Sequence, residues 1–374
     1  MDDIYSDIRP YTDAEVAEAL PSLAGGKLVA AAGRALYPDK PEDYLPKLVA
    51  SCRSVDEFQD KVISKAILRD LEITHSSLSY SGLDWFKESD GSIGSFVLLS
   101  THRDIVLDPA FVQLALLLNN MPTTEIAAGD NLLDNPEIAL AMRSNRMIKV
   151  VRSDNPRVVY ETSRLLSSYI REKVTKGGRS VWIAHRGGRT KNGRDCTEQG
   201  LLKMLDMSGT GSFYENFSQL KIMPVTISYE YETCGALKAL EMYKKEQQGF
   251  YRKQPGEDIN SMMQGFMQRK GRVHVDFAQP LTAEELLKAD SAQRNEKFRI
   301  LANTLDSRLH ASYRLWPANY AAADILLGSK EFFEGGFYTL ADKESLIDRL
   351  RRESEGMPDE IYTRMLHIYA AHII

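Results

Sequence analysis

Short apolar runs alternate with amphipathic segments between residues 95 and 277, and this alternation limits the fold more than any other feature. The apolar runs have the length of buried strands, and the segments between them repeat apolar residues every three or four positions, as helices do. Such an alternation is typical of β-α-β units. We therefore expect an α/β fold with a mixed, largely parallel sheet flanked by helices. The expected strands are 95–100, 125–128, 147–151, 180–184, 221–229 and 272–277.

Helical spacing dominates on both sides of this region. Segments 14–20, 27–36 and 55–71 predict helices, and no convincing strand pattern precedes Ser95. After Pro280 the pattern is helical again. We expect three parts: an N-terminal helical subdomain (1–88), an α/β domain (89–282), and a helical C-terminal extension packed on it (283–374).

The composition is that of a soluble globular protein. The 374 residues are 43% hydrophobic and 26% charged, and the longest apolar stretch, 110–118, is too short to span a bilayer. Segment 1–4 is acidic and lacks the basic and apolar regions of a secretory signal. The three cysteines, at 52, 196 and 234, have no metal-ligand spacing. We expect a cytoplasmic protein with reduced thiols, no metal, and at most peripheral contact with a membrane.

Positive charge is concentrated in one segment although the net charge is -5. Residues 143–194 contain fourteen Lys and Arg against three acidic residues. This asymmetry predicts an anion-binding face in an otherwise acidic protein. A nucleic acid is disfavoured as the anion, because the segment has no recognised nucleic-acid-binding module.

The strongest candidate for catalysis is the heptapeptide from His102 to Asp108. It follows the strand 95–100, and Asp108-Pro109 has the pattern of a cap and first residue of a helix, so His102 is expected on a strand-to-helix turn. An imidazole titrates near neutrality, and a nearby carboxylate fixes its tautomer and stabilises its cation. These groups suffice for a general base, although helix capping alone also explains Asp108.

Three further segments contain candidate binding residues. The strand 147–151 is followed by Arg152, and Trp182–Asn192 places paired glycines among Arg186, Arg189 and Lys191. Such a turn exposes backbone N–H groups beside guanidinium groups and can hold a phosphate or a carboxylate. It is not a Walker loop, because the spacing and the Lys-Ser/Thr ending are missing. Pro224 inside the strand 221–229 predicts a sheet edge or a bulge.

The order and spacing of these segments resemble the glycerolipid acyltransferase family, which includes the glycerol-3-phosphate and lysophosphatidic acid acyltransferases. The corresponding motifs are His102 with Asp108, Ile148 to Arg152, Gly187 to Thr190, and Ile222 to Ile227, followed by the strand that begins at Arg272. The resemblance covers about residues 90–282. Soluble plastid-type members of the family also have an N-terminal helical domain.

The resemblance implies an O-acyltransferase of phospholipid biosynthesis. It would move a fatty acyl group from acyl-CoA or acyl carrier protein to the hydroxyl of an anionic glycerolipid precursor, such as glycerol 3-phosphate or lysophosphatidic acid. His102 would be the general base, and Asp108 would orient it. No permanently bound cofactor is implied, and the enzyme would act peripherally at the inner face of the membrane. The residues expected to bind the substrate are Arg103, Lys149, Arg152, Gly188, Arg189 and Thr190.

Two departures from the family pattern leave alternatives open. Five residues instead of four separate His102 from Asp108, so Asp104 is a second candidate for orienting the imidazole. The glutamate of the third motif is missing, with Gly187 in its place. The acceptor could therefore be another lyso-lipid, such as a lyso-aminolipid with a carboxylate. A non-catalytic protein that binds lipid or acyl carrier protein is the alternative from another class.

Overall fold

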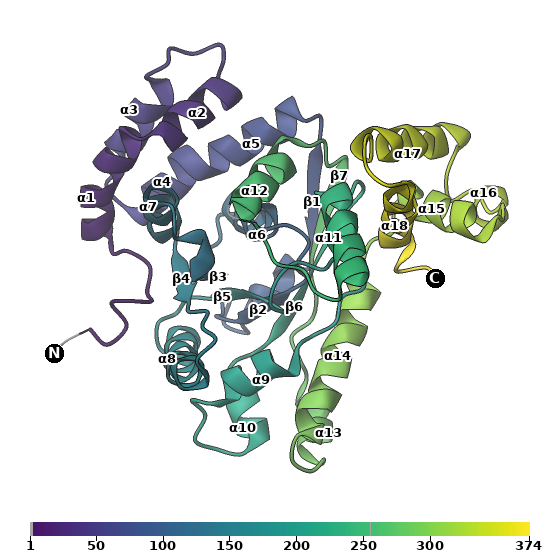
Figure 1. The fold of residues 1–374 in the computed structure, drawn as a ribbon. Coiled ribbons are helices and arrows are strands. Elements are labelled where there is room, and N and C mark those ends of the chain that lie inside the picture. The colour runs from purple at the N-terminus through teal and green to yellow at the C-terminus, as the bar shows by residue number, and fades with distance from the viewer. Residues whose placement is uncertain (1–2, 255) are drawn as a thin grey trace.

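One sheet of seven strands forms the centre of the computed structural model, which describes residues 3–254 and 256–374 (Figure 1). The strand order is β1-β7-β6-β2-β5-β3-β4, and only the β6·β7 pair is antiparallel. The strands are β1 (Ser77–Ser81), β2 (Val97–Ser100), β3 (Glu125–Gly129), β4 (Met147–Val150), β5 (Val181–Ala184), β6 (Met223–Tyr229) and β7 (Arg272–Phe277). The predicted mixed, largely parallel α/β sheet is confirmed.

The strand β1 was missed by the sequence pattern. Its sequence, Ser-Leu-Ser-Tyr-Ser, is mostly polar, and the strand lies at the edge of the sheet with one partner, β7. An edge strand does not need apolar residues on both faces, so its sequence does not look like that of a buried strand. The sheet therefore includes residues before position 88. The three-part division of the chain remains a prediction.

Pro224 does not mark an edge or a bulge, contrary to expectation. The strand β6 lies inside the sheet between β2 and β7. Pro224 is its second residue and precedes Val225, where the pairing with β7 begins. Since a proline near the start of a strand removes few ladder hydrogen bonds, the internal position is tolerated.

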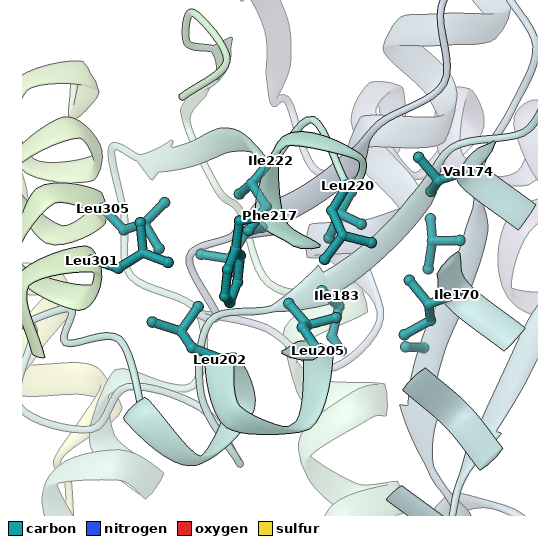
Figure 2. Packing of buried hydrophobic residues seen from close by; sticks show 14 of the residues in the cluster. Ile170, Val174, Ile183, Leu202, Leu205, Phe217, Leu220, Ile222, Leu301 and Leu305 are labelled. Atoms are coloured by element: carbon teal, nitrogen blue, oxygen red, sulfur yellow. The ribbon is translucent and has the colours of Figure 1, made fainter. Parts of the chain in front are cut away.

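Helices cover both faces of the sheet. Successive residues of a strand point to opposite faces, so Val97 and Leu99 of β2 enter one apolar cluster and Leu98 enters another. Figure 2 shows the first cluster, in which residues of α8, α9 and α14 meet those of β5. The second cluster joins α5 and α6 to the opposite face. The helices of the central region are α6 (Leu107–Leu118), α7 (Pro136–Ser144), α8 (Pro156–Thr175), α9 (Gln199–Asp206), α10 (Phe213–Ser218), α11 (Gly235–Gln248) and α12 (Glu257–Met267).

The N-terminal helices pack beside α7 at the β4 end of the sheet (Figure 1). Glu137 of α7 accepts hydrogen bonds from the backbone N–H groups of Lys27 (3.1 Å) and Leu28 (2.6 Å), which fixes the start of α2. The elements are α1 (Asp13–Ala24), α2 (Lys27–Leu36), α3 (Tyr44–Ser51), α4 (Val55–Phe58), a π-helical turn (Gln59–Ile63) and α5 (Ser64–Ile73).

The C-terminal region is helical, as expected. The helices α15, α17 and α18 enclose an alanine-rich cluster and pack on α11, at the opposite end of the molecule from α1 (Figure 1). The helices are α13 (Ala283–Asp290), α14 (Glu296–Ser312), α15 (Pro317–Leu327), α16 (Glu331–Glu334), α17 (Leu340–Glu353) and α18 (Asp359–Ala370). Among the residues that the structure describes, no helix combines the length and apolar character needed to cross a bilayer.

Candidate active site

The first and third motifs lie side by side at the carboxyl edge of the parallel strands. The strands β2 and β5 pair in parallel and end at Ser100 and Ala184, so the residues that follow them meet. The N–H of His185 donates to the carbonyl of Ser100 (2.8 Å), and the N–H of Thr190 donates to the carbonyl of His102 (2.7 Å). These backbone bonds hold the glycine-rich turn against the histidine.

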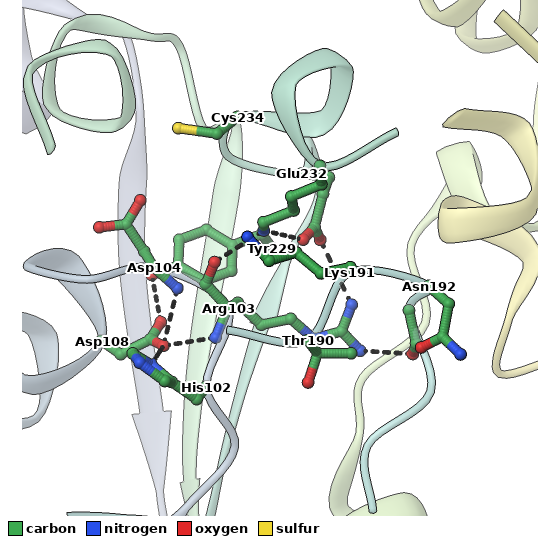
Figure 3. A network of polar contacts seen from close by, with 12 residues as sticks. His102, Arg103, Asp104, Asp108, Thr190, Lys191, Asn192, Tyr229, Glu232 and Cys234 are labelled. Atoms are coloured by element: carbon green, nitrogen blue, oxygen red, sulfur yellow. Dashed lines mark hydrogen bonds and ion pairs between the residues drawn. The ribbon is translucent and has the colours of Figure 1, made fainter. Parts of the chain in front are cut away.

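His102 and Asp108 form a hydrogen-bonded pair (Figure 3). The imidazole Nδ1 lies 3.3 Å from the Asp108 Oδ2. This carboxylate is fully buried and also accepts from the backbone N–H groups of Arg103 (2.6 Å) and Asp104 (2.8 Å), while the Tyr229 hydroxyl donates to its Oδ1 (2.8 Å). Burial and the Asp108 charge raise the pKa of Tyr229 well above its ordinary value, so the phenol stays a donor. With Nδ1–H donating to Asp108, Nε2 is the nitrogen that can accept a proton.

Asp104 caps the helix, contrary to the expectation that Asp108 does. The helix α6 begins at Leu107, and the Asp104 Oδ1 accepts from the N–H groups of Val106 and Leu107, both at 2.9 Å. Pro109 is therefore the third residue of the helix, where its missing N–H has no intrahelical partner in any case. Asp108, freed from capping, lies in the first turn and faces the imidazole.

His102 lies at the wall of a cavity of about 580 Å³. Most of the lining is apolar and comes from elements far apart in sequence: Leu28 of α2, Ile67 of α5, Met142 of α7 and Phe266 of α12. The polar lining includes Arg152, Arg186, Gly188, Arg189, Glu198 and Asp258. The cavity thus combines a mostly apolar lining with three arginines and one histidine.

The Arg189 guanidinium forms no ion pair within 4.0 Å among the described residues. Arg189 is only 6% exposed, and its Nη1 is buried without a hydrogen bond. Burial alone would raise the pKa of the nearby Asp258, but Lys253 and Arg189 lower it, which keeps this carboxylate charged at the cavity wall. A buried guanidinium without a paired anion is costly, so this geometry favours a site that an anionic ligand completes.

Three of the expected substrate-binding residues lie outside the cavity lining. Arg103 is 1% exposed and forms ion pairs with Asp195 (2.7 Å) and Glu232 (3.3 Å). The Lys149 ammonium lies 2.7 Å from the Asp7 carboxylate, and the Thr190 hydroxyl donates to Asp195 (2.7 Å). These side chains thus have partners within the protein, and their assignment to the substrate stays a prediction. Arg152, Gly188 and Arg189 do line the cavity.

Arg103 belongs to a buried polar cluster behind the histidine (Figure 3). Burial alone would raise the pKa of Asp195, but Arg103 and further donors hold it well below its usual range. The Lys238 ammonium donates to the Arg103 carbonyl (2.6 Å) and pairs with Glu232. His185 is fully buried in the same region, and burial lowers its pKa to about 4. The cluster thus supports the turn that presents His102.

The roles of Trp182 and Glu198 escaped the sequence argument. The Trp182 ring lies edge-on to the His102 ring, with 6.3 Å between the centroids, and Arg186 adds a further guanidinium to the cavity. The Glu198 Oε2 accepts a hydrogen bond from the N–H of Gly187 (3.0 Å), so a carboxylate lies beside the position where the motif glutamate is missing. Nothing in the local sequence links residue 198 to this turn. Arg186 was visible as part of the basic turn.

The fold thus brings a histidine and a buried carboxylate together at the carboxyl edge of a largely parallel sheet, an arrangement that is chemically able to transfer a proton. Residues 80–228 match the family model described as Acyltransferase. The matched segment contains the four motifs on which the resemblance to the acyltransferases was based, and it supports that resemblance. Among solved structures, the 1-acyl-sn-glycerophosphate (LPA) acyltransferase PlsC from Thermotoga maritima is similar at 12% identity, with a TM-score of 0.40, over 81% of this chain and 98% of that chain. No curated protein is significantly similar in sequence.

Proposed function

We propose that this protein transfers a fatty acyl group from a thioester donor, acyl-CoA or acyl carrier protein, to the hydroxyl of an anionic glycerolipid precursor such as glycerol 3-phosphate or lysophosphatidic acid. One observation carries the proposal: the His102–Asp108 pair lies in the wall of a cavity that also contains the unpaired guanidinium of Arg189. The family match supports acyl transfer, and these contacts support the roles given below.

In the proposed reaction, the Nε2 of His102 takes the proton of the acceptor hydroxyl while the oxygen attacks the thioester carbonyl carbon. The tetrahedral intermediate then collapses, the C–S bond breaks, and the proton on His102 passes to the departing sulfur. The ester and a free thiol are the products. Asp108 stabilises the imidazolium that forms between the two proton transfers, and such general-base catalysis contributes roughly 10²–10⁴-fold in rate.

Arg189, with Arg152 and Arg186, would bind the anionic group of the acceptor and orient its hydroxyl toward His102. Gly188 has a φ of 78° and no atom within 4 Å of the point where a Cβ would lie, so its backbone is open to a ligand. The apolar part of the cavity would hold an acyl chain. In this proposal no cofactor stays bound, and the enzyme meets its lipid substrate or product peripherally at the inner face of a membrane.

The test is release of free thiol by the purified protein. Wild-type protein is mixed with long-chain acyl-CoA or acyl carrier protein, with and without glycerol 3-phosphate, lysophosphatidic acid or a lyso-aminolipid. We expect thiol release that depends on one acceptor, that is lost in His102→Ala, and that is retained in His367→Ala, in which an exposed histidine is removed. Tight acyl-CoA binding without release from any donor would instead establish a non-catalytic binding protein.

A further inference from the structure

The helix α12 exposes three of its five large apolar side chains. Its buried residues are Ser261 and Gly265, whereas Ile259, Met263 and Met267 are 42%, 52% and 51% exposed. The exposed residues are four positions apart and therefore form one stripe along the helix, on the side opposite the small residues. A helix in water normally buries its apolar side, so this arrangement needs an apolar surface to cover the stripe.

The small residues on the inner side allow α12 to lie directly on the catalytic turn. A Cβ at Gly265 would come within 2.3 Å of the Asp104 Oδ2, and the carbonyl of Ser261 accepts a hydrogen bond from the Cys234 thiol (3.2 Å). Larger side chains cannot fit there. The inverted arrangement is thus a consequence of close packing against the site.

The apolar stripe is continuous with the cavity. Ile259 and Met263 are both exposed at the surface and part of the cavity lining, beside Met262 and Phe266. An acyl chain that enters along α12 therefore stays in contact with apolar side chains from the surface to the interior. Without such contacts the acyl chain would be exposed to water on its way from the surface to the interior, which is unfavourable in free energy.

Aromatic and basic residues lie next to the stripe in sequence. Phe250 is 65% exposed and directly follows Gly249, which ends α11. Lys244, Lys245, Arg252 and Arg269 are also exposed. Exposed apolar and aromatic residues flanked by Lys and Arg are typical of surfaces that dock on anionic lipid bilayers.

The basic segment 143–194 is a weaker candidate for this contact, because many of its charges are already neutralised within the protein. The ion pairs from this segment are Arg146–Asp56, Lys149–Asp7, Arg157–Glu161, Lys173–Glu125 and Lys191–Glu241. Three of its remaining arginines, Arg152, Arg186 and Arg189, line the cavity.

We propose that Phe250 and the stripe Ile259–Met263–Met267, flanked by these basic residues, dock the protein on an anionic lipid bilayer and open the cavity to it. This proposal rests on the proposed function in that the membrane supplies or receives the lipid. Binding to vesicles, however, requires no catalysis and is measured without substrate.

The experiment is cosedimentation with vesicles of phosphatidylcholine and phosphatidylglycerol in equal parts, compared with phosphatidylcholine alone. The test variant is Phe250→Ser/Met267→Ser, whose two positions do not line the cavity. The matched control is Phe337→Ser/Leu340→Ser, which removes two exposed apolar side chains (50% and 60%) from the C-terminal region, at the connection before α17 and at its first residue. Thermal unfolding of each variant shows that it is folded.

We expect wild type and control to bind the anionic vesicles. The test variant should bind them at least about tenfold more weakly, since two large side chains no longer enter the bilayer. Binding to neutral vesicles should be weaker than binding to anionic vesicles. Added salt should reduce binding to the anionic vesicles, because it screens the attraction between the basic residues and the lipid headgroups. Thiol release with a short-chain acyl-CoA and glycerol 3-phosphate, both water-soluble, should be equal in the test variant and wild type.

A second probe locates the contact directly. In Phe250→Trp, lipids with brominated acyl chains should quench more fluorescence than in wild type. Equal vesicle binding by test variant and control, no binding by wild type, or self-association that the test variant loses would each overturn the docking surface. The first two results leave thiol release untouched, so failure of this inference is distinguishable from failure of the proposed function.

Discussion

Replacing Asp108 with Asn is the most direct test of the proposed general base. The carboxylate is fully buried, and its Oδ2 faces the His102 Nδ1 at 3.3 Å. An asparagine has the same shape. Its carbonyl can still accept from the backbone N–H groups of Arg103 and Asp104, and its amide can donate to the Tyr229 oxygen. The substitution therefore removes the charge and leaves the turn in place.

The size of the effect follows from the distance. Two unit charges 3.3 Å apart attract each other by about 5 kcal/mol at an effective dielectric constant of about 20. His102 is 14% exposed, so solvent screens a part of this attraction, and about 3–5 kcal/mol remains for the imidazolium. Since each 1.36 kcal/mol corresponds to a tenfold rate change, kcat should fall by roughly 10²–10⁴.

The assay is acceptor-dependent thiol release under saturating substrate. We expect Asp108→Asn to lower kcat and to leave the KM for the acceptor within about threefold, because the lost interaction forms only with the transition state. The matched control is Asp104→Asn. This carboxylate lies in the same turn but caps α6, and the amide oxygen of the variant can still accept from Val106 and Leu107.

Two results would refute the reasoning. If Asp108→Asn keeps kcat within tenfold of wild type, the carboxylate does not stabilise a cation on His102. If Asp104→Asn is as damaging as Asp108→Asn while both remain folded, the loss reflects the turn and not the charge. Circular dichroism and thermal unfolding of both variants distinguish these cases from unfolding.

Three further predictions follow from the site. Arg189→Met should raise the KM for the anionic acceptor by about 10–100-fold and yet raise the free energy of unfolding by about 1–3 kcal/mol, because a buried, unpaired charge disappears; a destabilised variant in urea titrations would argue against an unpaired guanidinium. Ala141→Phe fills the apolar part of the cavity, so kcat/KM should fall about tenfold more for long than for short acyl-CoA. An equal loss for all acyl lengths would mean that the acyl chain binds outside this part of the cavity. Burial lowers the pKa of His185 from 6.5 to about 4, so between these pH values the unfolded chain binds more protons than the native one; the stability that His185 contributes is complete above pH 6.5 and lost as the pH falls toward 4. His185→Gln should therefore reduce the loss of unfolding free energy between pH 7 and pH 4 by about 3 kcal/mol. An equal loss for both proteins in urea titrations at the two pH values would contradict this prediction.

The regular part of the fold could be predicted because it follows from local pattern. The strands from β2 to β7 are apolar runs of the expected length, and the pairing of β2 with β5 places the first and third motifs together without further information. The strand β1 could not be found in this way, since its polar sequence reflects its place at the sheet edge. Location in the sheet, and not strand propensity alone, decides which residues a strand needs.

The roles of individual charged residues could be predicted only in part. Arg103 and Arg189 look alike in sequence, as arginines close to a histidine or a glycine pair. The structure separates them through distant partners: Arg103 forms ion pairs with Asp195 and Glu232, which are 92 and 129 residues away, whereas the buried Nη1 of Arg189 has no hydrogen bond among the described residues. Contacts over such separations depend on the tertiary fold, which no local pattern contains.

Gly265 has a consequence for how this enzyme can be diversified. Any side chain at that position must push α12 outward or shift Asp104, because no room exists for even one additional carbon. Since α12 forms one wall of the cavity, a change at residue 265 would move that wall although this residue does not itself line the cavity. We therefore expect variation at position 265 to alter which ligands fit the cavity, while His102, Asp108 and Arg189 stay unchanged.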